Sequence, residues 1–237
     1  MTTDKGMFAT EAAPSRGRDH GKYKYLAAFD FDSTLIDREV IDAIAEIAGM
    51  HAQVSKITKM VVNGELPLED ALHQRAAMLE GVTVQDCMLL GDRIKVMDNI
   101  APTMEHLKAH GFYIAIISAS LNPVAARVAS RRDFSAIDQF LFNTLRASNG
   151  KLNGEVDIRV SDKGALVFKL QQELGIPKSH TLSVGDGSMD LPMFAESGLS
   201  IAFNAKEIAK KAAMRSVDGK DIGKIVPVVD EWLAKKK

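Results

Sequence analysis

The sequence has little cysteine and no excess of basic charge, and each shortage excludes a class of protein. The single cysteine, Cys87, excludes an intramolecular disulfide framework and a multi-cysteine zinc site, and it fits a reducing compartment. The 30 Lys and Arg residues against 31 Asp and Glu leave a formal net charge of −1. Proteins that bind nucleic acid through its phosphates usually show a basic excess, so we expect no nucleic-acid partner.

Long hydrophobic segments are also lacking. No apolar run approaches the roughly 18 residues of a membrane span, and residues 1–25 carry charges throughout in place of the apolar block of a secretory signal. We therefore expect no membrane partner and a cytoplasmic location. The 237 residues are 46% hydrophobic and 26% charged, which is ordinary for a globular protein and excludes a disordered or collagenous chain.

Short apolar runs alternate with amphipathic helical segments over most of the chain. The runs predict strands at 25–31, 112–117, 140–142, 181–184 and 199–203. This alternation predicts an α/β fold, a doubly wound parallel sheet covered on both faces. Residues 52–97 show no strand signal, so we expect a helical cap domain at 38–97 inserted into a core of 25–37 and 98–237. Residues 1–24 are polar and small and predict a loose tail, or alternatively a short docked arm.

Polar side chains follow three of the predicted strands. Asp30 and Asp32 follow the first, Ser118 the second, and Asp186 and Asp190 a later one. In open α/β sheets, ligands bind outside the carboxyl ends of the strands, so these clusters are expected to meet in one crevice. Mg²⁺ prefers oxygen ligands, commonly one or two carboxylates, which makes Asp30 and Asp186 candidate ligands.

A carboxylate can also act as a covalent nucleophile through an aspartyl-phosphate. That step needs the charge on the carboxylate and on the phosphoryl oxygens to be neutralised, which a metal and a lysine supply. Lys163 opens a predicted helix just before the later carboxylate cluster. Asp32 lies two residues beyond Asp30, on the same side of an extended chain, where it could protonate a leaving alkoxide and then activate water.

The order of these motifs resembles the haloacid dehalogenase superfamily of aspartate-nucleophile phosphatases. Asp30-Phe-Asp-Ser-Thr34, Ser118, Lys163 and Gly185-Asp-Gly-Ser-Met-Asp190 match its four motifs in order. A closer likeness, over nearly all of residues 25–215, is to phosphoserine phosphatases, which act in L-serine biosynthesis. It rests on the segments 31–42, 62–75 and 198–206.

This resemblance implies a hydrolase whose nucleophile is Asp30 and whose general acid/base is Asp32. Mg²⁺ would take the side chains of Asp30 and Asp186 and the backbone oxygen of Asp32, with Asp190 supporting the metal from nearby. In the phosphoserine phosphatases, the residues matched by Glu39 and Arg75 bind the amino and carboxylate groups of the substrate. The phosphate contacts would be supplied at the positions of Ser118, Ala119, Lys163 and Met189.

The sequence departs from the family pattern in three places. Ala119 and Ser120 follow Ser118 where Gly-Gly is usual, Met189 stands where Asn or Thr is frequent, and Leu68 stands where a pocket phenylalanine is common. The expected substrate is O-phosphoserine, and another amino-alcohol or hydroxy-acid phosphate stays open, as does a non-catalytic phosphate binder on the same fold. We expect a monomer or homodimer.

Several of the singled-out residues also have a purely structural interpretation. Glu39 and Arg75 could be surface charges or could pair with each other. Five of the six histidines are expected to be ordinary surface or hydrogen-bonded residues without the spacing typical of metal ligands, namely His20, His51, His73, His110 and His180.

Overall fold

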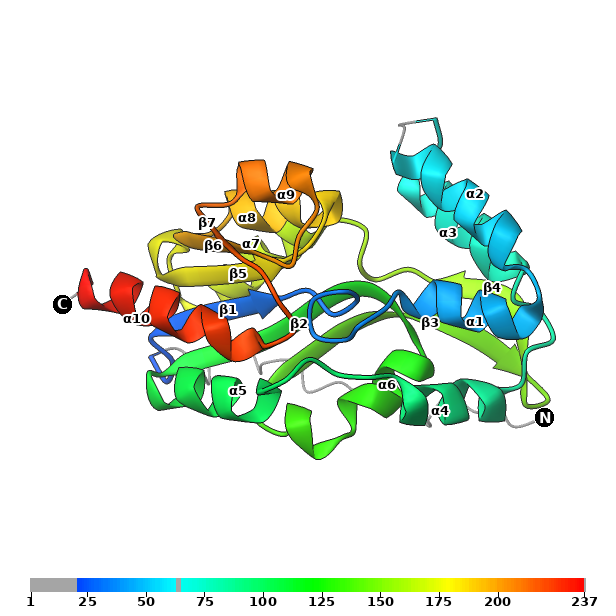
Figure 1. Cartoon of the computed structure of the whole chain (residues 1–237), viewed down its shortest axis with the longest axis horizontal. Helices are drawn as coiled ribbons and strands as arrows, with labels where there is room; N and C mark the ends of the chain where they lie inside the picture. The colour runs from blue at the N-terminus through cyan, green and yellow to red at the C-terminus, as the bar shows by residue number, and fades with distance from the viewer. Residues whose placement is uncertain (1–20, 63–64, 237) are drawn as a thin grey trace.

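A computed structural model describes residues 21–62 and 65–236. Within these residues seven strands form one sheet in the order β4-β3-β2-β1-β5-β6-β7 (Figure 1). All neighbouring pairs are parallel except β3 and β4, which form an antiparallel hairpin. The predicted α/β class is confirmed. Most of the predicted tail, residues 1–20, lies outside the described residues. Near the end of that predicted tail, the Tyr23 hydroxyl donates a hydrogen bond to Asp138 Oδ1 at 3.1 Å.

The strands have the bounds β1 Tyr25–Phe29, β2 Phe112–Asn122, β3 Gln139–Ser148, β4 Lys151–Asp157, β5 Thr181–Gly185, β6 Leu199–Phe203 and β7 Arg215–Val217. The helices have the bounds α1 Val40–Ala48, α2 His51–Val62, α3 Leu68–Ala77, α4 Val84–Arg93, α5 Ile100–Ala109, α6 Val124–Ala129, α7 Lys163–Leu174, α8 Leu191–Ala195, α9 Glu207–Ala212 and α10 Val226–Ala234.

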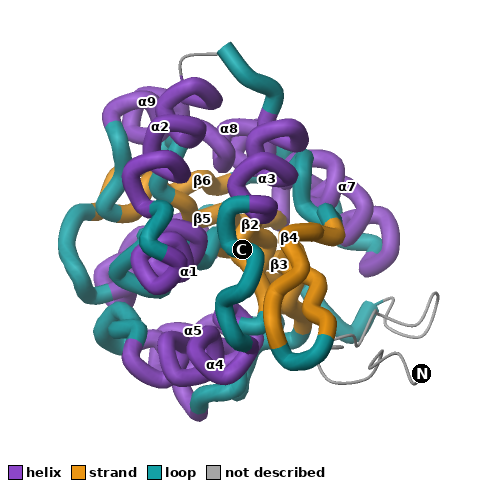
Figure 2. Tube along the Cα trace, turned by 90° about the vertical axis from the view of Figure 1, so that its right-hand side faces the viewer, coloured by secondary structure: helices purple, strands orange, loops and turns teal. Residues whose placement is uncertain are grey.

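Helices cover both faces of the sheet, and the alternation of side chains along β1 explains why. Ala27 and Phe29 belong to one apolar core, which also contains residues of α5, α6 and α10. Leu26 and Ala28 belong to a second core with residues of α7, α8 and α9. Successive side chains of a strand point to opposite faces, so a fully apolar strand needs a helical layer on each side. Figure 2 shows the strands between α4 and α5 on one side and α8 and α9 on the other.

Two strand predictions needed correction. The second strand does not end before Ser118: β2 continues to Asn122, and its register against β3 shifts between Ile117 and Leu121. Residues 118–120 therefore form an irregularity inside a strand, which could not be predicted by ending the strand at its first polar residue, Ser118. The third strand is also longer than the predicted 140–142: β3 runs from Gln139 to Ser148 and pairs with the antiparallel edge strand β4. The two are joined through Asn149 and Gly150, where the sequence predicts a hairpin turn, with φ values of 51° and 75°. Positive φ at both positions suits a tight hairpin turn.

Within its described residues, the segment between β1 and α5 contains the helices α1 to α4 and only isolated β-bridges. Helices α2 and α3 project away from the sheet at one end of the molecule (Figure 1). Helix α4 instead lies along α6, where Arg127 Nε donates to Asp92 Oδ1 at 2.7 Å. None of the described helices is long and apolar enough to cross a membrane.

Candidate active site

The predicted site residues of the core lie at one edge of the sheet. Strand β1 has β2 on one side and β5 on the other, so Asp30 and Asp186, which follow β1 and β5, and Ser118, in the irregular part of β2, lie on neighbouring strands. Asp30 directly follows β1, and its backbone N–H donates to Val184 O in β5 at 2.9 Å. The side chains of Asp30, Ser118 and Asp186 are all buried. Residues that are distant in the sequence are thus brought to neighbouring strands, at or near the carboxyl ends of β1 and β5.

Lys163 joins two of the carboxylates. Its Nζ lies 2.7 Å from Asp30 Oδ1 and 2.6 Å from Asp190 Oδ1. It is the first residue of α7, which Asp162 caps by accepting from Ala165 N; such a cap fixes where the helix begins. Burial lowers the pKa of the Lys163 ammonium, but the charges of Asp190 and Asp30 raise it by more, so it lies above its usual value. Lys163 is therefore a fixed cation beside Asp30.

Asp190 positions both Lys163 and the backbone after β5. Its Oδ2 accepts from the N–H groups of Asp186 and Gly187, each at 2.9 Å, while Oδ1 accepts from Lys163. With both oxygens engaged and no exposed surface, Asp190 is poorly placed to take a metal and well placed to hold the groups around one. A Cβ on Gly185 would lie 2.3 Å from Asp190 Cγ, so this close approach requires glycine.

The carboxylates form an excess of negative charge that fits a divalent cation. Oxygens of Asp30, Asp186 and Asp190 lie within 4.8 Å of one another, and the single buried ammonium of Lys163 does not balance them. Burial, followed by the charges of Asp30 and Asp190, raises the pKa of Asp186 to about 7. A hard cation bound by oxygens would offset this repulsion. The donor set therefore fits Mg²⁺, with Asp30 and Asp186 as the side chains whose oxygens are not fully committed.

Asp32 has a different environment from Asp30. Its Oδ2 accepts from Val40 N at 3.1 Å, at the start of α1. Burial, then the charges of Glu39 and Asp30, raises the pKa of Asp32 well above its ordinary value. A carboxyl group with a raised pKa holds its proton more readily and can donate it to a leaving group. The environment of Asp32 therefore favours the general acid/base role that its spacing from Asp30 suggests.

Glu39 and Arg75 are neither free surface charges nor an ion pair with each other. Glu39 is half-buried and its Oε1 accepts from Ser33 Oγ at 3.1 Å. Arg75 is buried in α3 and donates to Ala71 O and to Thr58 Oγ1 at 3.2 and 3.3 Å. Burial lowers the pKa of Arg75, partly offset by the charges of Asp42 and Glu39. The Arg75 guanidinium is therefore close enough to Glu39 for the Glu39 charge to raise its pKa.

The Ser118 segment is held by a residue that sequence reasoning missed. Asn143 is fully buried in β3, and its Nδ2 donates to Ala119 O at 3.3 Å and to Val160 O at 3.4 Å. Its Oδ1 accepts from the N–H groups of Arg159 and Val160 at 2.8 and 2.9 Å. One amide thus ties the irregular part of β2 to the segment that leads into Lys163. No motif marked it, since an isolated asparagine in a strand carries no spacing signal.

Lys206 is a second residue that received no role from the sequence. Its Nζ lies 3.7 Å from Asp186 Oδ2, and its side chain is largely exposed. It supplies a second cation beside Asp186. Ala119 and Met189, the positions that depart from the family pattern, are both half-buried, and Leu68 is half-buried at the start of α3.

Comparison with known proteins agrees with the resemblance to haloacid dehalogenase-type phosphatases that the sequence motifs suggest. A family model described as haloacid dehalogenase-like hydrolase matches residues 26–198. The phosphoserine phosphatase of Methanocaldococcus jannaschii is 33% identical over 211 residues, 88% of this chain and 99% of that protein. That of Lactococcus lactis subsp. lactis is 33% identical over 216 residues, covering 90% and 99%. A solved phospho-aspartyl intermediate analogue of phosphoserine phosphatase matches with a TM-score of 0.79 at 33% identity, over 87% of this chain and 99% of that one.

Proposed function

Because the chain belongs to the haloacid dehalogenase-like hydrolases, in their phosphoserine phosphatase-like group, we propose that it hydrolyses O-phosphoserine to serine and phosphate through an aspartyl-phosphate. The observation that carries this proposal is the contact of 2.7 Å between Lys163 Nζ and Asp30 Oδ1 in a buried carboxylate cluster. A carboxylate repels phosphate and so does not suit a site that only binds phosphate, whereas a carboxylate nucleophile must come close to the phosphorus atom. The cation beside Asp30 makes that approach possible.

In the first step the Asp30 carboxylate attacks phosphorus, the bond to the serine oxygen breaks, and Asp32 protonates the leaving alkoxide. In the second step Asp32 takes a proton from water, whose oxygen attacks the phosphorus and releases phosphate from Asp30. The raised pKa of Asp32 supports both roles. Lys163 and the Ser118 hydroxyl would hold the phosphoryl oxygens.

Mg²⁺, held by the side chains of Asp30 and Asp186 and the backbone oxygen of Asp32, would neutralise charge on the phosphoryl group. Asp190 would keep Lys163 and the backbone around Asp186 in position. This assignment is supported by the excess of buried carboxylates and by the two oxygens of Asp190 being already hydrogen-bonded.

Substrate choice would come from Glu39 and Arg75. A carboxylate and a guanidinium of opposite sign suit a zwitterion, and a guanidinium can hold a carboxylate through two hydrogen bonds. Residues 38–97 would act as a cap over the substrate, excluding bulk water when closed. Helix α3 of this segment carries Arg75.

Phosphate release in the presence of Mg²⁺ over a panel of phosphate esters tests this proposal. The panel contains O-phosphoserine, O-phosphothreonine, phosphoethanolamine, glycerol phosphate and p-nitrophenyl phosphate. The expected result is the highest kcat/KM for O-phosphoserine; a higher value for another ester would reassign the substrate, consistent with the departures at Ala119 and Met189.

Asp30→Asn is the control for the covalent step. It should abolish turnover while the thermal unfolding midpoint stays close to that of the wild type. Turnover by Asp30→Asn at the wild-type rate would contradict the aspartyl-phosphate, and absence of turnover by the wild type on every ester would favour the phosphate binder.

A further inference from the structure

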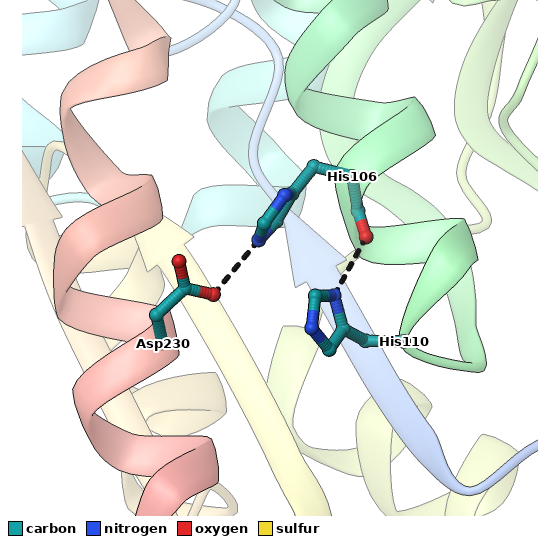
Figure 3. A group of neighbouring side chains, drawn as sticks. All are labelled: His106, His110 and Asp230. Carbon is teal, nitrogen blue, oxygen red and sulfur yellow. Dashed lines mark hydrogen bonds and ion pairs between the residues drawn. The ribbon is translucent and has the colours of Figure 1, made fainter.

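Two histidines and one carboxylate lie together between α5 and α10. His106 Nε2 is 2.8 Å from Asp230 Oδ1, and the imidazole rings of His106 and His110 have centroids 4.6 Å apart. One ligand atom from each of the three residues can be chosen so that all lie within 4.8 Å of one another. Figure 3 shows both rings on the side of α5 that faces Asp230. His106 precedes His110 by one helical turn, a spacing that the expectation for the histidines did not take into account.

From this cluster we propose a surface site for a borderline divalent cation of the Zn²⁺ type, held by His106, His110 and Asp230. Two histidines four residues apart on a helix point to the same side. Imidazole nitrogen and carboxylate oxygen are both zinc ligands. Three protein ligands leave a fourth position for water, as in open zinc sites.

The hydrogen bonding of His110 supports this use. Its Nδ1 lies 3.0 Å from His106 O, and a carbonyl oxygen can only accept, so Nδ1 carries the proton. The other ring nitrogen of a neutral imidazole is then unprotonated and available as a metal ligand. A ligand histidine commonly donates its second N–H to a backbone carbonyl, which fixes the orientation of the ring. His110 thus has the tautomer and the support that metal binding needs.

At His106 the cation would replace the proton shared between Nε2 and Asp230 Oδ1. Binding would therefore release that proton. Adjacent ligand atoms of a tetrahedral zinc lie about 3.3 Å apart, as metal–ligand distances near 2.0 Å require. The cluster is half-exposed, with His106 and Asp230 side chains 30% and 47% accessible. Small rotations of these side chains can therefore bring the three atoms to that spacing.

The site is independent of the candidate active site. His110 precedes Phe112, the first residue of β2, so the cluster lies near the amino ends of the strands, whereas Asp30 follows the carboxyl end of β1. It also differs in chemistry, because the active-site cluster offers only oxygens, which Mg²⁺ prefers. Helices α5 and α10 come from parts of the chain 124 residues apart, so a bound cation would cross-link them and stabilise the fold.

Calorimetric titration of the full chain with ZnCl₂, in excess Mg²⁺, tests this site. The Asp186→Asn variant is titrated beside the wild type to separate any Zn²⁺ held by the active-site carboxylates. We expect one Zn²⁺ site that Asp186→Asn retains and that His110→Ala weakens by at least about 10-fold. His106→Ala and Asp230→Asn should weaken it as well. His73→Ala, which removes an exposed histidine on α3, is the matched control and should leave it unchanged.

Thermal unfolding gives a second readout. At 100 times the dissociation constant, Zn²⁺ should raise Tm by about 5 to 10 °C in the wild type and in His73→Ala, and not in His110→Ala. Equal Zn²⁺ affinity in wild type, His106→Ala and His110→Ala would overturn the proposal. So would the absence of any Zn²⁺ site that survives Asp186→Asn.

Discussion

Replacing Gly185 by alanine should damage the site through Asp190. An added Cβ would lie 2.3 Å from Asp190 Cγ and 2.4 Å from its Oδ2, whereas non-bonded heavy atoms prefer about 3.5 Å or more. Asp190 would therefore have to retreat by about 1 Å. It is fully buried and held by contacts of 2.6, 2.9 and 2.9 Å, so it can retreat only by breaking some of them.

The size of the effect follows from these contacts. Overpacking a filled interior costs about 1–3 kcal/mol, and a hydrogen bond to a charged group contributes about 1.5–3 kcal/mol. We expect the free energy of unfolding of Gly185→Ala to fall by about 3 kcal/mol, which lowers Tm by about 6 to 12 °C in a chain of this size. Because Lys163 loses the partner that positions it, kcat/KM for phosphate release should fall about 100-fold.

Gly187→Ala is the matched control, because it makes the same change two residues away. A Cβ there would meet only Lys206 Nζ, at 3.7 Å, and Gly187 has a φ of −136°, which alanine adopts without strain. Its free energy of unfolding should stay within about 0.5 kcal/mol of the wild type. Tm is measured by calorimetry and kcat/KM by phosphate release. Equal losses in Gly185→Ala and Gly187→Ala, or wild-type values in both, would refute the reasoning.

Three further predictions follow from other contacts. Asn143→Ala leaves buried N–H and C=O groups unpaired and should lower the free energy of unfolding by about 2–4 kcal/mol and kcat/KM at least tenfold. Asn122→Ala removes only a contact of 3.4 Å, so equal Tm losses in the two variants would contradict this. Arg75→Ala should raise KM for O-phosphoserine at least tenfold more than for p-nitrophenyl phosphate; equal changes would defeat its role in binding carboxylate. Burial, then the charge of Asp86, raises the pKa of the Cys87 thiol to about 12. Iodoacetamide should therefore label the native protein at pH 8 far more slowly than the urea-unfolded protein, and comparable rates would show that Cys87 is accessible.

The parts of the site that sequence could predict are those with a local signal. Asp30 and Asp32 follow an apolar run that reads as a buried strand, and Lys163 follows a capping residue at a helix start. Parallel topology then places the ends of such strands at one edge. These residues could be brought together without knowing any contact between them.

The remaining parts depend on contacts between segments that no local pattern relates. Asn143 holds the site because β3 lies beside the irregular part of β2, and neither that irregularity nor the pairing register is encoded by periodicity. His106 and Asp230 meet only because α5 and α10 pack on the same face of the sheet. A helical spacing of two histidines could have been noticed, but the carboxylate that completes the set comes from 124 residues away. Such residues act through the partners that the fold supplies, so only the structure reveals them.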